Sequence, residues 1–303
     1  MAKITLGLPY KGSKAAIAED IVKKLPPGGR ILDACCGGGA FLMAAAMSLK
    51  WDSVVGNDLN KATIALLDAV LIHKGQIDYE HPAPCSRVDF FNSLQRIENG
   101  DFDIQDCVNK YCASFGNDGK TYLYGEQIEE YKLIAEKMLT APTLSERRSN
   151  YRKFFEIMTN EDDDGRLQKL EFVQRLQSLE RLERLERLDI FDIDYKGFDV
   201  VYFDPPYKGT NKYDFEFDHD RFYDLFKSLK TDLKINAFLS EYDAPFTCVA
   251  EFEKTQLMAA SVGSSKSTTM EKLYFNGTAD EYRELMGRFY DNGAQKDCQQ
   301  SLF

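Results

Sequence analysis

Hydrophobic and polar positions in the first part of the chain follow the pattern of alternating helices and strands. Ile17, Ile21 and Leu25 recur at helical spacing. Ser13 is a residue type that caps helices, so a helix is predicted from Ser13 to Leu25. Residues 30–34 (Arg-Ile-Leu-Asp-Ala) are predicted to form a short buried strand, which runs straight into Cys35-Cys36 and three glycines that predict a turn.

The same alternation continues, is lost, and then returns. A helix over 40–49, a strand over 52–57 and a second amphipathic helix over 61–73 follow the glycines. Strand, turn, helix and strand within about 30 residues predict a right-handed parallel unit of a doubly wound sheet. The pattern disappears between residues 79 and 189 and returns as a strand over 198–203, a helix over 221–230 and strands over 237–239, 249–253 and 272–275.

We therefore predict an α/β fold with one interrupted domain. Residues 1–78 and 190–292 form the domain, residues 79–189 form an inserted region, and residues 293–303 form a flexible tail. The inserted region contains at least one helix, predicted over 125–139. The insertion thus separates the first strands of the sheet from the later ones.

A leucine tract lies at the end of the inserted region. Five leucines recur at every third position from Leu176 to Leu188, with Glu-Arg pairs between most of them. Leucines at this spacing drift by roughly 60° each around an α-helix and form no continuous seam. The tract is predicted to be a short charged helix or a connector to the next strand, with a partner-binding element as the alternative.

Composition and charge narrow the class of protein. The chain is 44% hydrophobic and 29% charged, and its longest apolar run, over 41–49, is shorter than the about 20 residues that span a bilayer. The N-terminus has no apolar signal core, and the seven cysteines show no framework spacing, so a reduced, cytoplasmic protein without membrane contact is expected. A net charge of −11 argues against a nonspecific polycationic nucleic-acid binder but allows local basic patches.

The strongest candidate site is Asp204-Pro205-Pro206-Tyr207, directly after the predicted strand over 198–203. Consecutive prolines fix the backbone in an extended turn, and ligands of open α/β sheets bind at this edge. The Asp204 carboxylate and the Pro205 carbonyl can accept the two N–H bonds of an exocyclic amine, while Tyr207 stacks on the ring. The alternative is an incidental surface turn.

A second candidate site is the glycine turn at residues 33–41. Its glycines permit close approach of a ligand, but Leu42 stands where a dinucleotide fingerprint has its third glycine, so a nicotinamide enzyme is disfavoured. Asp58, at the end of the second predicted strand, is placed to accept hydrogen bonds from ribose hydroxyls. A plain loop is the alternative for the glycines taken alone.

No metal site is predicted. Cys107 and Cys112 lack a second pair at metal-ligand spacing, and His73, His81 and His219 fit no ligand or triad pattern.

Taken together, these motifs resemble the alpha-group adenine-specific DNA methyltransferases, which are relatives of DNA adenine methylase. The resemblance is carried by Pro-Tyr-Lys-Gly-Ser-Lys at 9–14, the glycine turn at 33–41, Asn57-Asp58 and the turn at 204–207, in the order of the family. It covers roughly residues 6–78 and 190–276. It implies a Rossmann-like, S-adenosylmethionine-dependent methyltransferase sheet with a largely helical inserted target-recognition domain.

The resemblance also implies roles for individual residues. Lys14 would approach the methionine carboxylate of S-adenosylmethionine, Asp33 the methionine amino group, Asp58 the ribose and Asp194 the adenine amine. The implied cofactor-binding set is Tyr10, Lys14, Asp33, Cys35, Gly37, Gly39, Phe41, Asp58, Asp194, Tyr195 and Asp204, and the implied catalytic set is Asp204, Pro205, Pro206 and Tyr207. The chain departs from the family where Ala34-Cys35-Cys36 replaces an aromatic residue of the glycine turn.

The implied partner is double-stranded DNA, from which the target adenine must be flipped, and the resemblance also allows a cognate restriction nuclease. Residues 101–192 carry 14 basic and 20 acidic residues, so contacts must come from local charge. The candidate DNA-binding residues are Arg147, Arg148, Asn150 and Arg152, in the one dense basic stretch, and Lys208 and Lys212, beside the catalytic turn. A solvated helix face paired with Glu146 and Glu156 is the alternative for the basic stretch.

The predicted function is site-specific methylation of the exocyclic amine of a flipped adenine in DNA. An RNA adenine methyltransferase with the same pocket is the nearest alternative. Protein glutamine methyltransferases usually carry Asn where Asp204 stands, and a catalytically silent DNA-binding protein would leave the complete motif set unexplained.

Overall fold

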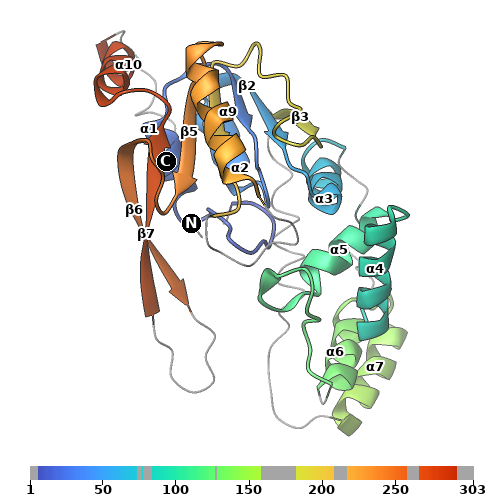
Figure 1. Ribbon diagram of the computed structural model, residues 1–303. Coiled ribbons are helices and arrows are strands. Elements are labelled where there is room, and N and C mark those ends of the chain that lie inside the picture. Colours follow the sequence, from blue (N-terminus) through green and yellow to red (C-terminus); the bar gives the residue numbers. More distant parts are fainter. Residues whose placement is uncertain are drawn as a thin grey trace. The chain divides into compact units, whose positions relative to one another are not determined.

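The chain divides into two compact units in the computed structural model (Figure 1). The structure describes residues 6–73, 77, 84–126, 128–157, 182–207, 217–257 and 266–291. The first unit comprises Met1–Ser13, Gly37–Gly39 and Asn60–Glu180, and the second comprises Lys14–Cys36, Ala40–Leu59 and Arg181–Phe303. Each unit is described by itself.

The second unit is built on a seven-stranded sheet with the order β3-β2-β1-β4-β5-β7-β6. The strands are β1 (Gly28–Asp33), β2 (Trp51–Asn57), β3 (Leu182–Glu186), β4 (Val200–Phe203), β5 (Asn236–Glu241), β6 (Thr247–Leu257) and β7 (Lys266–Phe275). Neighbouring strands from β3 to β5 are parallel, whereas β7 is antiparallel to both β5 and β6. The strand order reverses between β1 and β4, which is where open α/β sheets bind ligands.

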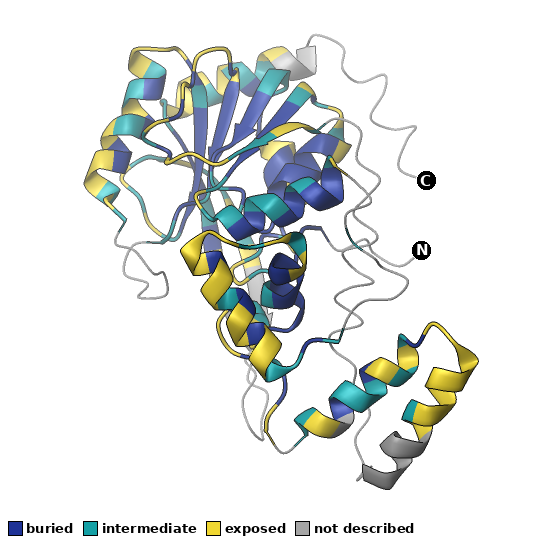
Figure 2. Ribbon diagram, turned by 90° about the vertical axis from the view of Figure 1, so that its right-hand side faces the viewer, coloured by how far each residue is buried: buried dark blue, intermediate teal, exposed yellow. Residues whose placement is uncertain are grey.

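Helices cover both faces of this sheet. The second unit contains α1 (Ala18–Lys24), α2 (Ala40–Ser48), α9 (His219–Thr231) and α10 (Ala279–Asp291). Successive side chains of a strand point to opposite faces, so Tyr202 and Phe203 of β4 face different helices. Tyr202 stacks on Phe41 of α2 with ring centroids 3.9 Å apart, while Phe203 contacts Phe222 of α9 edge-on at 5.2 Å. The central strands are accordingly buried, as Figure 2 shows in dark blue.

The first unit is helical in the part that the structure describes. Its elements are α3 (Lys61–Leu71), α4 (Arg87–Asn99), α5 (Ile104–Cys112), the 3-10 turn η1 (Phe115–Asn117), α6 (Glu129–Leu139) and α7 (Leu144–Ile157). Ser86 with Asp89, and Asp103 with Asp106, form capping boxes at the starts of α4 and α5. These boxes explain locally why the two helices begin where they do. The expected largely helical inserted region agrees with these elements.

Helix α1 is shorter than predicted. It begins at Ala18, and the cap position, Ile17, makes no side-chain hydrogen bond. Ser13 therefore does not cap it. The carbonyl of Lys14 instead accepts hydrogen bonds from the amides of Ile17 and Ala18, at 2.9 and 2.8 Å, in the turn that precedes the helix.

The leucine tract is a strand where the structure describes it, so the expected helix or connector is wrong for residues 182–186. β3 pairs in parallel with β2 and is the edge of the sheet. Asn57 anchors its end, because its side-chain amide donates to the Leu188 carbonyl at 3.0 Å and its side-chain oxygen accepts from the Leu188 amide at 2.8 Å. Leu185 packs beside Gly56, where a Cβ atom would lie 2.8 Å from the leucine. The strand β3 of the sheet thus precedes Ile190 in the chain.

The three-residue repeat allows the role of β3 to be tested by two deletions. Deleting Glu183-Arg184-Leu185 returns the sequence Leu-Glu-Arg-Leu-Glu to every strand position, because the repeat period is three. We expect the melting temperature and cofactor affinity of this variant to match those of the wild type. Deleting only Glu183-Arg184 places a charged residue where Leu182 stands and should lower the melting temperature by several degrees. If both deletions lower the melting temperature equally, the stability of β3 does not depend only on which residue types occupy its positions.

None of the helices in the described segments combines the length and the apolar composition needed to cross a membrane.

Candidate active site

Three carboxylates follow three adjacent strands of the sheet. Asp33 ends β1, Asp58 comes directly after β2, and Asp204 comes directly after β4. Because β2, β1 and β4 are neighbouring parallel strands, their carboxyl ends meet at one edge. A backbone hydrogen bond joins β1 and β4 near this edge: the Ala34 amide donates to the Tyr202 carbonyl at 2.9 Å, two residues before the catalytic turn. The predicted acidic residues are therefore brought together.

The turn at residues 204–207 carries an acid and an aromatic ring side by side. The side chain of Asp204 is 19% exposed and Tyr207 is half-buried. The Tyr207 ring meets the ring of Tyr242, which follows β5, edge-on with centroids 4.7 Å apart. An acceptor for an amine and an aromatic ring thus occur within this turn, and a second ring, Tyr242, lies beside it.

Lys14 is held against this turn. Its side chain is buried, and its Nζ lies 2.8 Å from Asp204 Oδ1 and 3.3 Å from Glu271 Oε1. It also donates a hydrogen bond to the Tyr207 hydroxyl. Burial alone would lower the pKa of Lys14, but the negative charges of Asp204 and Glu271 outweigh burial and raise that pKa above its ordinary value. Lys14 is therefore a buried cation paired with the buried Glu271 and the partly exposed Asp204.

Sequence reasoning did not find Glu271. It lies on β7, where its side chain is 1% exposed, and alternate residues of the same strand, Leu273 and Phe275, are fully buried. The sequence signal that marks Glu271 is a charged residue at one of the alternate strand positions whose other members, Leu273 and Phe275, are apolar. The predicted strand over 272–275 began one residue too late to show it.

Asp33 is a buried carboxylate without a protein partner. It is 1% exposed, and neither of its oxygens has a hydrogen-bond partner among the described residues. Burial raises the pKa of Asp33 well above its usual value, and the negative charges of Asp204 and Asp58 raise it further. The backbone amides of Cys35 and Leu42 lower the pKa of Asp33 but offset this rise only in part. Such a carboxylate suits a cationic ligand group.

The cysteines of the turn after β1 are not nucleophiles. Desolvation raises the pKa of both Cys35 and Cys36 well above the ordinary value, and the Asp58 carboxylate raises them further. A thiol that stays protonated is a poor nucleophile. The site therefore fits direct transfer without a covalent intermediate on cysteine.

Three other predicted cofactor residues have local structural roles. Phe41 is buried and stacks on Tyr202 in the core. Tyr195 is buried as well, and its hydroxyl donates to the Ile190 carbonyl at 2.6 Å. Asp194 is exposed and accepts a hydrogen bond from the Lys196 amide at 3.1 Å.

In the first unit, Tyr10 supports the glycine turn. The Leu8 amide donates to the Gly38 carbonyl at 2.6 Å, and a Cβ atom at Gly38 would lie only 2.6 Å from that of Tyr10. Gly37 and Gly39 have φ angles of 47° and 79°, in the left-handed region that favours glycine. The turn is therefore glycine-rich because of its close approach to Tyr10 and its backbone conformation.

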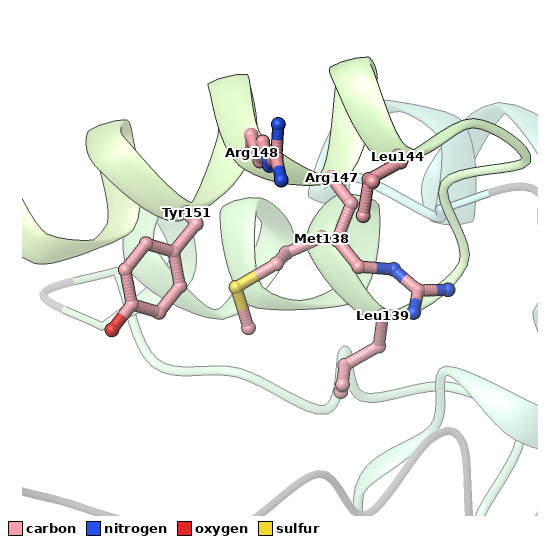
Figure 3. A pocket seen from close by; sticks show the side chains of 6 residues that line it. All are labelled: Met138, Leu139, Leu144, Arg147, Arg148 and Tyr151. Atoms are coloured by element: carbon pink, nitrogen blue, oxygen red, sulfur yellow. The ribbon is translucent and has the colours of Figure 1, made fainter.

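The basic stretch lies on α7 and lines an open pocket. The pocket measures about 370 Å³ and is formed with α6; its lining residues, shown in Figure 3, are Met138, Leu139, Leu144, Arg147, Arg148 and Tyr151. Asn150 turns instead toward α6, where its amide donates to the Lys137 carbonyl at 3.1 Å. Lys208 and Lys212 lie outside the described residues, as does the side chain of Arg152. The structure thus brings Arg147 and Arg148 together with an aromatic ring.

Within the described segments, no three His, Cys, Asp or Glu side chains gather as metal ligands.

A doubly wound sheet with acids at its switch point and a Pro-Pro turn beside them is typical of α/β enzymes that bind a nucleotide-like cofactor at this edge. Residues 10–274 match the D12 class N6 adenine-specific DNA methyltransferases, and the chain belongs to this family. It is an adenine-specific DNA methyltransferase, and S-adenosylmethionine is its methyl donor. This assignment confirms the predicted activity and cofactor.

Comparison with solved structures gives weaker likenesses. Two structures of the rRNA methyltransferase aviRa from Streptomyces viridochromogenes each align with 15% identity and a TM-score of 0.37, over 91% of this chain and 91% and 90% of theirs. A structure of the protein SMU.472 with SAH bound aligns with 12% identity and a TM-score of 0.31, over 86% of this chain and 51% of that chain. Similarities this low contribute nothing to the assignment. No curated protein sequence matches the chain.

The described residues fit S-adenosylmethionine. The molecule carries two cationic centres, an amino group and a sulfonium, and the buried Asp33 carboxylate lacks a partner of its own. The half-buried Asp58 follows the second strand, at the position where related sheets bind ribose hydroxyls.

Proposed function

We propose that this enzyme is an alpha-group, Dam-like member of its family, which methylates a flipped adenine in double-stranded DNA. The observation that carries the proposal is the Asp204 carboxylate, paired with Lys14 at 2.8 Å and flanked by Tyr207 at the carboxyl end of β4. The chain order supports the subgroup: the cofactor motifs come first, the helical region follows, and the catalytic turn comes last.

The catalytic turn acts on the amine of the flipped base. Asp204 and the Pro205 carbonyl accept its two N–H bonds, which favours a pyramidal nitrogen with a localised lone pair. S-adenosylmethionine, when bound, would supply an electrophilic methyl group, and the electron pair of its S–C bond would stay on sulfur as the N–C bond forms. The nitrogen would then release one proton to the Asp204 carboxylate, which accepts its hydrogen bond. Positioning contributes several of the about 7–11 kcal/mol available in ideal cases, and Tyr207 stacks on the ring to hold it in line.

The cofactor residues lie around the acidic edge. We assign Asp33 to the methionine amino group, Asp58 to the ribose and Asp194 to the adenine amine. We assign backbone or packing roles to Tyr10, Cys35, Gly37, Gly39, Phe41 and Tyr195. The proposed contact of Lys14 with the methionine carboxylate requires its ammonium to release one of three partners, since an ammonium has only three donors.

Replacing Asp58 by Ala should weaken S-adenosylmethionine binding about tenfold or more, because the ribose hydroxyls lose charge-assisted hydrogen bonds. Calorimetry without DNA measures this directly. Asp52→Ala is the matched control, since Asp52 is an exposed residue at the other end of β2. Unchanged affinity in Asp58→Ala would contradict the placement of the ribose.

We assign the helical region, residues 79–189 as predicted, to target recognition, with Arg147, Arg148 and Arg152 contacting phosphates together with Lys208 and Lys212. The pocket beside Tyr151 supports this assignment, because arginines around an exposed aromatic ring suit a nucleic acid. The assignment of Asn150 to base recognition requires its amide to leave the Lys137 carbonyl. A cytoplasmic location and a cognate restriction nuclease are proposed from sequence and family resemblance.

The double variant Arg147→Ala/Arg148→Ala should bind duplex DNA more weakly and with a salt dependence reduced by about two phosphate contacts. Fluorescence anisotropy over a salt series measures both quantities. Arg283→Ala/Arg288→Ala, on exposed sites of α10, removes the same charge elsewhere and should change neither. Equal losses in both double variants would indicate a general charge effect instead of a binding site.

The proposed function is tested by tritium-methyl transfer to duplex DNA and to RNA, followed by nucleoside analysis. We expect N6-methyladenine in duplex DNA. Labelling of RNA alone would overturn the proposal.

A further inference from the structure

We propose that Glu271 is a positioning residue for methyl transfer, which holds the ammonium of Lys14 against Asp204 and so keeps the catalytic carboxylate ionised and oriented. The inference rests on the proposed function of Asp204. It assigns a role to an acidic residue far along the chain from the catalytic turn.

The geometry allows Lys14 little freedom. Its Nζ forms ion pairs with Asp204 Oδ1, at 2.8 Å, and with Glu271 Oε1, at 3.3 Å, and it donates a hydrogen bond to the Tyr207 hydroxyl. The Lys14 side chain is 6% exposed and that of Glu271 is 1% exposed. A lysine side chain is flexible by itself, so the second anion decides where its ammonium rests. Lys14 in turn engages Asp204 through Oδ1.

Glu271 lies on a strand that pairs with a neighbour on each side. β7 pairs with β6, where Glu271 lies opposite Phe252, and it pairs with β5, where Lys272 lies opposite Glu241. Leu273, two residues along the same face, is fully buried. Glu271 is therefore mounted on a central strand, which suits a residue that positions another.

The charges around Asp204 show why a cation is needed there. The titratable groups that act on this edge are the carboxylates of Asp33, Asp58 and Glu271, the ammonium of Lys14, the thiols of Cys35 and Cys36, and the hydroxyls of Tyr202 and Tyr207. Several acids buried together drive one of them to take up a proton. A protonated Asp204 would lose its ability to accept the amine hydrogen with full negative charge.

The first test is the variant Glu271→Gln, which keeps the shape of the side chain and removes its charge. We expect kcat to fall about tenfold or more through misplacement of Lys14. The DNA KM and the flipping signal of 2-aminopurine should stay within about threefold, because neither Glu271 nor Lys14 is assigned a contact with DNA. Glu253→Gln is the matched control: Glu253 is exposed on the neighbouring strand β6, and this variant should retain wild-type kcat.

The second test is a double-mutant cycle with Lys14→Met. This variant leaves Asp204 and Glu271 together without their cation, so the acidic limb of the kcat/KM profile should move to higher pH. The double variant Lys14→Met/Glu271→Gln no longer has the repulsion between Asp204 and Glu271. The acidic limb of its kcat/KM profile should therefore move back toward lower pH, and its activity at neutral pH should exceed that of Lys14→Met. If the losses of activity in the two single variants simply multiply in the double variant, or if the acidic limb of the pH profile does not move, the role of Glu271 is overturned.

A third measurement uses the protein without DNA or cofactor. In Lys14→Met a buried carboxylate has a raised pKa in the folded state, so its stability is present at low pH and is lost as pH rises through that value. Denaturant unfolding from pH 4 upward should show this loss, and the double variant should show less of it. The same pH dependence in both variants would also overturn the inference. Absence of methyl transfer by the wild type to DNA would instead overturn the proposed function.

Discussion

Replacing Asp204 by Ala is expected to lower the rate of adenine methylation by about a hundredfold or more, since removal of one such preorganised group typically costs this much. The carboxylate acts on the amine as the N–C bond forms, so DNA affinity should change little. Some loss of cofactor affinity is expected, because we place the same carboxylate near the positive sulfonium. Methyl transfer under single-turnover conditions measures the step directly.

The structure shows why the Asp204→Ala variant should still fold. Lys14 retains Glu271 as its counter-ion at 3.3 Å, so no uncompensated buried cation is left. A thermal unfolding curve close to that of the wild type is therefore the control. Asp204→Asn, which keeps one acceptor oxygen, should lose less activity than Asp204→Ala. Methylation at a near-normal rate by Asp204→Ala would refute the catalytic assignment.

Replacing Tyr207 by Ala is expected to weaken the flipped state, because stacking of an aromatic side chain on a base is worth roughly 1–3 kcal/mol. The fluorescence of 2-aminopurine at the target position should increase less on binding than it does with the wild type. The edge-on contact with Tyr242, at 4.7 Å between centroids, is lost as well. Binding of the same duplex should be measured alongside, to separate flipping from affinity.

Tyr207→Phe separates the ring from the hydroxyl. The hydroxyl accepts a hydrogen bond from Lys14, so its removal should cost about 1 kcal/mol, or roughly fivefold in rate, while flipping is retained. Roughly a fifth of the activity should therefore remain, more than in Tyr207→Ala. If Tyr207→Phe is as impaired as Tyr207→Ala, the hydroxyl matters as much as the ring and the stacking explanation is wrong.

Local sequence determined the elements whose signals lie within a few residues. The apolar run before the glycine turn and the run that ends at Phe203 are both strands, because a buried strand needs only a short continuous apolar segment with a breaker after it. Placement of Asp33, Asp58 and Asp204 at strand ends followed from these runs. Because β2, β1 and β4 are parallel neighbours in the structure, the three acids lie at one edge.

Only the tertiary structure decided which of these residues are partners. The leucine tract has no local strand signal, and its residues 182–186 form β3 because β2 offers them an edge to pair with. Lys14 and Tyr207 lie 193 residues apart, and Glu271 is further still, so no local pattern joins them. Their contact arises because β7 is inserted antiparallel beside β5, which places an inward-facing acid of the last hairpin against the catalytic turn. Short-range periodicity therefore determined the strands and their acidic ends, whereas long-range pairing of the sheet determined the charge that surrounds Asp204.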